Sequence, residues 1–174
     1  QHLEPVAENV EDGILQLVVK TTTSDILIAA CARNVLLQGG SGSSSRTDSG
    51  DGWISQEFQV EASQAQEITL EKMVTLFTSR DPGIEDPLNE AVVTLSQAAD
   101  YGKELNLSAG RWKEIWGQVD IRIGGDRESQ KLVRLHAYHM MVTASPHHAG
   151  LDSGIPPRGL HGEAYRGHIF WDEL

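Results

Sequence analysis

The sequence predicts an α+β fold in which strands occupy the first part of the chain and helices occupy the second. Up to about residue 79, short runs are rich in β-branched and aliphatic residues, as in Ile14–Val19, and such runs are typical of strands. After the pair Asp86-Pro87, apolar residues recur at helical spacing instead. The pattern changes within residues 79–83, which read Ser-Arg-Asp-Pro-Gly.

The predicted strands are short segments rich in apolar residues. They cover residues 14–19, 26–31, 53–60, 68–70 and 73–78. In the third of them Ile54, Phe58 and Val60 fall on one face, which is the pattern of a half-exposed strand. Antiparallel strands with one wet face suit a sandwich. The Gly- and Ser-rich residues 39–52 are predicted to be a flexible loop.

Three helices are predicted in the second part. The first begins at Asp86, a good N-cap residue, with Pro87 in the first turn. The second runs from Ser108 to near Gly117 and carries two tryptophans on one face. After a short connection at residues 119–126, the third covers roughly residues 127–143, and residues 145–165 are expected to be mostly loop.

Composition and charge exclude several classes of protein. The 174 residues carry a formal net charge of −11, and so acidic a surface repels nucleic acid and anionic membranes. No apolar run is long enough for a membrane-spanning helix. The single cysteine, Cys31, lies within an apolar strand pattern and is expected to be a buried, inert thiol. One cysteine also fits a reducing compartment, so we expect a cytoplasmic protein.

The two ends of the chain are unusual. It begins with Gln1 rather than Met, and it stops at an aromatic and apolar cluster, Phe170-Trp171-Asp172-Glu173-Leu174. Natural termini are usually polar. We therefore expect the chain to be part of a longer protein.

Histidines and carboxylates give weak indications of catalysis. His136 and His139 are three residues apart on a predicted helix, but a zinc site needs a third ligand. Histidines that make ordinary hydrogen bonds are therefore the better interpretation, and no metal is predicted. Glu163, Asp172 and Glu173 are candidates for carboxylate chemistry. Nucleotide-binding and serine-nucleophile motifs are absent from the sequence.

Residues 154–174 combine glycine, aromatic and charged residues at close spacing. An aromatic side chain can stack on the apolar face of a sugar, and a neighbouring carboxylate can accept hydrogen bonds from its hydroxyls. The pair Trp171-Asp172 offers both features. The alternative is that Phe170 and Trp171 are core anchors and that Asp172 caps a helix.

Residues 159–173, GLHGEAYRGHIFWDE, closely resemble a signature of glycoside hydrolase family 65. That family contains maltose, trehalose, kojibiose and nigerose phosphorylases and some hydrolases. Two upstream segments agree with its pattern. One comprises Glu71-Lys72 and Thr78-Ser79-Arg80-Asp81, and the other comprises Trp112, Trp116, Asp120-Ile121, Gly125-Asp126, Gln130, Arg134 and His139.

The resemblance implies the end of an N-terminal β-sandwich, then linker helices, then the start of an (α/α)6 barrel. The corresponding segments are residues 1–79, 80–126 and 127–174. This division agrees with the change from strand to helix patterning near residue 80.

The resemblance also implies a sugar-binding role for the terminal motif. Asp172 would bind glucose hydroxyls and Trp171 would pack against the ring, while Arg166, His168 and Phe170 would line or support the pocket. The family's general acid and phosphate-binding loop lie downstream of this motif. No catalytic residue is therefore assigned in this chain.

The implied activity is inverting cleavage of a small α-linked glucose disaccharide, by phosphate or by water. No cofactor is implied beyond inorganic phosphate as co-substrate of a phosphorylase. The expected partners are the disaccharide and, through exposed barrel or sandwich surface, a further copy of the chain. The alternative is a non-catalytic remnant that binds a carbohydrate or a partner protein.

Overall fold

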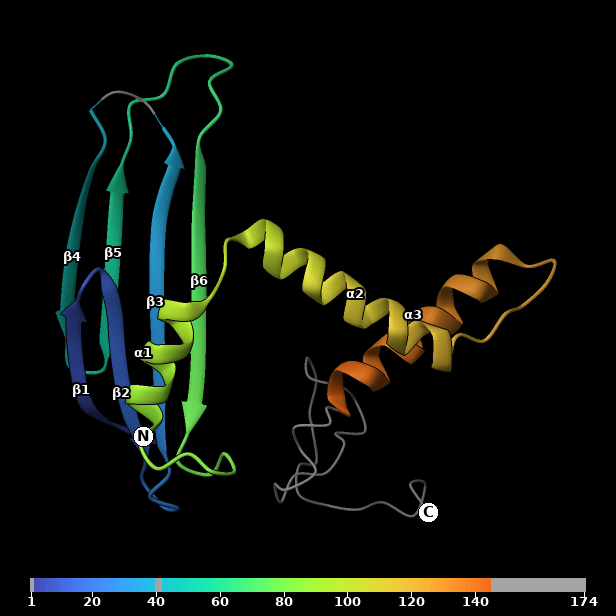
Figure 1. Cartoon of the computed structure of the whole chain (residues 1–174), viewed down its shortest axis with the longest axis horizontal. Coiled ribbons are helices and arrows are strands. Elements are labelled where there is room, and N and C mark those ends of the chain that lie inside the picture. The colour runs from blue at the N-terminus through green and yellow to red at the C-terminus, as the bar shows by residue number, and fades with distance from the viewer. Residues whose placement is uncertain (1, 40–41, 145–174) are drawn as a thin grey trace. The chain divides into compact units, whose positions relative to one another are not determined.

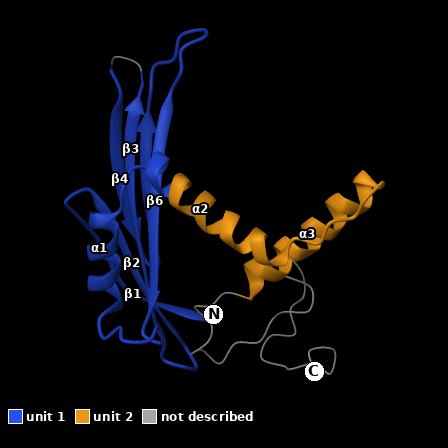
Figure 2. Cartoon of the chain, turned by 45° about the vertical axis from the view of Figure 1, so that its right-hand side comes forward, with its two compact units in different colours: residues 1–104 blue, residues 105–174 orange. Residues whose placement is uncertain are grey.

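The computed structural model describes residues 2–39 and 42–144 (Figure 1). The chain divides into two compact units, residues 1–104 and 105–174, which we call the first and second unit (Figure 2). The strands are β1 (Leu3–Glu11), β2 (Ile14–Thr21), β3 (Leu27–Gln38), β4 (Ser44–Gly50), β5 (Trp53–Gln59) and β6 (Thr69–Thr78). The helices are α1 (Pro87–Gln97), α2 (Tyr101–Val119) and α3 (Arg127–Thr143).

The first unit contains two antiparallel sheets. One has four strands in the order β1-β2-β3-β6, and the other is the hairpin of β4 and β5. The tight turn between β1 and β2 is Asp12-Gly13, and both residues have positive φ, 49° and 77°. Such a turn matches the twist of the paired strands. The strands-then-helices order confirms the predicted α+β class.

The structure corrects the interpretation of residues 39–52 as a flexible loop. Residues 44–50 form β4, which pairs with β5 from Ser44 opposite Gln59 to Gly50 opposite Trp53. Backbone pairing and the turn at Gly52, with φ of 81°, hold this strand without apolar side chains. The strand β1 was also not predicted, and the two segments expected at 68–70 and 73–78 form the single strand β6.

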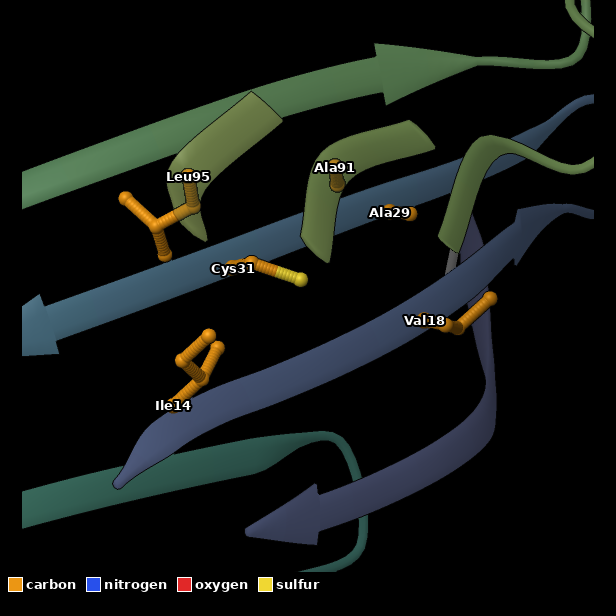
Figure 3. Packing of buried hydrophobic residues seen from close by; sticks show 6 residues of the cluster. All are labelled: Ile14, Val18, Ala29, Cys31, Ala91 and Leu95. Atoms are coloured by element: carbon orange, nitrogen blue, oxygen red, sulfur yellow. The ribbon is translucent and has the colours of Figure 1, made fainter. Parts of the chain in front are cut away.

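One face of the four-stranded sheet packs against α1, as Figure 3 shows. Ala29 and Cys31 of β3 meet Ala91 and Leu95 of α1, and all four residues are 0% exposed. Ile14 and Val18 of β2 complete this cluster. The small side chains at Ala29 and Ala91 bring the helix close to the sheet, so this contact forms the core of the first unit.

Polar side chains bind both ends of α1 and fix its position. The contacts at its start agree with the predicted N-cap. The Asp86 carboxylate accepts hydrogen bonds from the backbone N–H groups of Leu88 and Asn89, at 3.0 and 3.1 Å. At the other end, the Arg33 guanidinium donates to the carbonyl oxygens of Leu95 and Ala98, both at 3.4 Å. Backbone groups that a helix end leaves unpaired are thereby satisfied.

The helix α2 is longer than the sequence indicates. It begins at Tyr101 rather than Ser108 and continues past Gly117 to Val119. A side chain of the sheet stabilises its first turn, because the Glu71 carboxylate of β6 accepts a hydrogen bond from the Tyr101 N–H at 2.8 Å. The bounds of α3 agree with the prediction, and Asp126 caps its start.

Replacing Leu95 by alanine tests whether α1 holds the first unit together. We expect Leu95→Ala to lower the free energy of unfolding by about 2–5 kcal/mol, because it removes buried methyl groups and leaves a cavity. Leu76→Ala is the matched control, since Leu76 is 63% exposed and should change stability by less than about 0.5 kcal/mol. Urea denaturation followed by circular dichroism measures both. Equal effects would contradict the assigned core.

Candidate functional site

The residues predicted to contact the sugar lie outside the described residues. They are Arg166, His168, Phe170, Trp171 and Asp172. The candidate site that can be built from side chains therefore lies upstream, at the junction of α2 and α3 within the second unit.

An ion pair joins the residue after α2 to the middle of α3. The Arg134 guanidinium donates from Nε to Oδ1 of Asp120 and from Nη2 to Oδ2, both at 2.8 Å. Arg122 also approaches Oδ2 with its Nε, at 3.5 Å. The Asp120 side chain is only 17% exposed, whereas that of Arg134 is 50% exposed. This two-point geometry fixes the plane of the guanidinium.

The hydrogen bonds from Arg134 hold the pKa of Asp120 below its ordinary value, with further contributions from the charges of Arg134 and Arg122. The same contact with Asp120 raises the pKa of Arg134. Both groups are therefore ionised at neutral pH, and the pair persists there as a carboxylate and a guanidinium.

The side chain of Gln130, one helical turn before Arg134, is hydrogen-bonded to the backbone of the same connection. Its Nε2 donates to the carbonyl oxygen of Ile121 at 2.8 Å, and its Oε1 accepts from the N–H of Ile123 at 2.7 Å. At the end of the connection the Asp126 carboxylate accepts from Glu128 N, Ser129 N and Ser129 Oγ. Residues 120–126 are thus held to the start of α3 by side chains of α3 and by its N-cap.

Aromatic rings pack beside this connection. The ring centroids of Trp112 and Trp116 lie 6.4 Å apart, and those of Trp112 and Tyr138 lie 5.1 Å apart. Tyr138 in turn contacts the ring of His139 at 5.9 Å. The two tryptophans lie four residues apart on one helix face, as predicted. Rings in such tilted contact restrict one another's motion.

Together these groups form an open cleft of about 270 Å³, lined by Trp116, Asp120 and Arg134. The sequence named all three residues through the family resemblance but gave them no role. Asp120 and Arg134 are 14 residues apart, so no helical or strand spacing joins them. The cleft offers an aromatic wall, a carboxylate and a guanidinium, and these groups can bind a ligand but do not by themselves form an acid–base pair.

A second cavity, of about 450 Å³, lies between the two sheets of the first unit. Its apolar lining comes from Leu15, Leu17, Ala30, Ala32, Ile54 and Val74. Asn34 spans the sheets by donating from Nδ2 to Oε1 of Gln56 at 2.9 Å. Its lining contains one charged residue, Lys72, so it provides no pair of catalytic groups.

Other candidate chemistry finds no support within the part of the chain that the structure describes. No three His, Cys, Asp or Glu residues there come together as a metal site. Cys31 is buried, and burial raises the pKa of its thiol, as expected of an inert cysteine. None of the described helices has the length and apolar character required to cross a membrane.

The ion pair between Asp120 and Arg134 should make stability depend on pH. A carboxyl whose pKa is lowered by folding stabilises the folded state above its ordinary pKa of about 3.9, and this contribution is lost as the pH falls through the lowered value. We expect Asp120→Asn to unfold at lower denaturant concentration than the unmodified chain at neutral pH. This difference should shrink progressively below about pH 4.

Denaturation midpoints measured across this pH range test the expectation. Asp48→Asn is the control, because Asp48 is an exposed carboxylate in β4 of the other unit. A difference between Asp120→Asn and the unmodified chain that stays constant down to the lowest pH would contradict the ion-pair assignment.

Two family models match the chain in order. Residues 1–115 match the model described as the N-terminal domain of glycosyl hydrolase family 65, and residues 134–174 match that of the family's central catalytic domain. The first match alone covers more than half of the chain. The candidate cleft lies around the end of the first match and the start of the second.

Individual proteins similar to this chain agree with the two family matches. An uncharacterized glycosyl hydrolase of Mycobacterium tuberculosis is 38% identical over the whole chain, which covers 13% of that protein. A trehalose 6-phosphate phosphorylase of Lactococcus lactis is 32% identical over 91% of the chain, which covers 20% of that protein. The chain thus spans a fifth or less of the length of these relatives.

A solved structure, a putative kojibiose phosphorylase from the human microbiome, matches the fold with a TM-score of 0.73. It is 18% identical in sequence, and the match covers 98% of this chain and 22% of that structure. The strands-then-helices arrangement is therefore one that occurs inside a larger protein. With both family models matching in order, the chain belongs to glycosyl hydrolase family 65.

Proposed function

We propose that this chain is a segment of an inverting α-glucoside phosphorylase or hydrolase. The observation that carries the proposal is the order of the two family matches, with the N-terminal domain first and the central catalytic domain after it. The relative from Lactococcus lactis is named as a phosphorylase, which supports phosphate as the attacking group. The substrate would be a small α-linked disaccharide of the trehalose, maltose, kojibiose or nigerose type.

The reaction would proceed in a single displacement. A general-acid glutamate protonates the glycosidic oxygen while phosphate attacks the anomeric carbon, giving β-glucose 1-phosphate and the free second sugar. In a hydrolase, a second carboxylate activates water instead. The general acid would lie downstream of residue 174, so the chain by itself would be inactive. No cofactor would be needed besides phosphate.

Within this proposal the chain contributes the sugar-binding wall. Asp172 would accept hydrogen bonds from glucose hydroxyls, and Trp171 would pack against the ring. Arg166, His168 and Phe170 would line or support that pocket. Residues 1–79 would belong to the sandwich domain, 80–126 to the linker and 127–174 to the barrel. The longer protein would work in the cytoplasm.

A second candidate is a non-catalytic protein that binds a partner or a carbohydrate. The observation that favours it is the open face of β6, where Leu70, Val74 and Leu76 are each at least half exposed. Apolar residues gathered on one face often mark a surface that packs against further protein. A second copy of the chain could cover that face.

The activity test uses the longer polypeptide that contains this chain. We expect it to release glucose 1-phosphate, or glucose, from one of the four disaccharides. Asp172→Asn should lower kcat/KM by about 10- to 150-fold, since a charged hydrogen bond contributes about 1.5–3 kcal/mol. Asp48→Asn, in the exposed strand β4, should leave it unchanged.

Comparing rates with and without phosphate separates phosphorolysis from hydrolysis. A longer polypeptide that is inactive on all four disaccharides under both conditions would contradict the proposed activity. Turnover by the 174-residue chain alone would contradict the assignment of the general acid to the region downstream.

A further inference from the structure

We propose that the cleft lined by Trp116, Asp120 and Arg134 binds one pyranose ring of a carbohydrate. The described residues that line this site lie in the second unit between 116 and 134. They are other residues than those proposed above for the glucose pocket. The inference rests on the geometry of the cleft and does not require the proposed enzymatic activity.

The first requirement of a pyranose site is a rigid apolar wall, and Trp116 provides it. Its ring contacts Trp112 at a centroid distance of 6.4 Å, and Trp112 is itself held by Tyr138 at 5.1 Å. The C–H groups on one face of a pyranose pack well on the face of an indole. Because the ring is already restrained by its neighbours, little side-chain entropy is lost when a ligand binds.

The second requirement is a fixed set of hydrogen-bonding groups for the ring hydroxyls. A guanidinium has five N–H donors, and Arg134 uses two of them on Asp120, so three remain for a ligand. Each oxygen of the carboxylate has more than one lone pair, so Asp120 can also accept from a hydroxyl. A donor and an acceptor held side by side match two adjacent hydroxyls, each of which can both donate and accept.

Size and charge favour a neutral single ring. The cleft volume of about 270 Å³ lies just below the roughly 300–1,000 Å³ of sites for drug-sized ligands, so it suits one ring better than a disaccharide. The charge of Arg134 is offset by the Asp120 carboxylate, and Arg122, which approaches the same carboxylate at 3.5 Å, has a side chain that is 88% exposed to solvent. The chain as a whole is strongly acidic, at −11, which disfavours an anionic ligand.

The test measures binding of methyl α-glucopyranoside to the 174-residue chain by isothermal titration calorimetry and saturation-transfer NMR. We expect a dissociation constant on the order of 1 mM, typical of an open site with few contacts. Trp116→Ala should weaken binding at least about tenfold through loss of the stacking wall. Arg134→Lys should weaken it several-fold, because an ammonium cannot keep the planar two-point geometry.

Two tryptophan controls separate this cleft from other sites. Trp53→Ala removes a more exposed tryptophan, in β5 of the first unit and 46% exposed, and should leave binding unchanged. Trp171→Ala removes the aromatic wall of the proposed glucose pocket. Any binding that it costs belongs to that pocket, whereas the binding that Trp116→Ala removes should remain. Circular dichroism spectra confirm that each variant is folded, and Trp116→Phe, which keeps an aromatic ring, should retain most of the binding.

Three results would overturn the inference. The first is no binding of methyl α-glucopyranoside at ligand concentrations on the order of 100 mM. The second is loss of binding in Trp171→Ala but not in Trp116→Ala, which assigns the sugar to the proposed glucose pocket and leaves the proposed function intact. The third is competition by inorganic phosphate, which would make the cleft an anion site.

Discussion

The close packing of α1 on the four-stranded sheet is the contact on which the first unit depends. Ala29 and Cys31 on the sheet meet Ala91 and Leu95 on the helix, with no exposure to solvent. Larger side chains at the two alanines would push the helix away, because interiors are packed to near-crystalline density. The contact also has a polar part, since Thr75 Oγ1 donates to the Ala91 carbonyl oxygen at 2.8 Å. This one face therefore sets both the position and the register of α1.

The second unit is held in another way. Among the described residues of α2 and α3, only Thr143 is buried, so a hydrophobic core does not explain how residues 120–126 are held. Side-chain contacts from Gln130 and Arg134 to the connection, together with the tryptophan cluster, take that role. A polar pair with fixed geometry contributes little through burial but restricts conformation strongly. The cleft owes its shape to this restriction.

Much of the fold follows from patterns within single segments. Apolar runs predicted β2, β3, β5 and β6, and the pair Asp86-Pro87 predicted the start of α1. β1 and β4 carry acidic or Ser-rich sequences and depend on their neighbours for pairing, so no local pattern marked them. The early start of α2 has the same origin, because the Tyr101 N–H is bound by Glu71 of a distant strand. The Asp120–Arg134 pair joins residues 14 positions apart, so no local pattern marked it either. The sugar-binding role of residues 159–173 lies outside the described residues and remains a prediction.

Native-state hydrogen exchange at increasing guanidinium concentration tests most directly whether α1 and the sheet form one cooperative structure. Amides of β2, β3 and α1 should open with the same free energy, because they share one buried contact. Amides of β4 and β5, which lie outside that contact, should open at lower free energy. Exchange of the α1 amides at a lower free energy than those of β2 and β3 would show that the helix leaves the sheet without unfolding it, and that α1 and the sheet are not one cooperative structure.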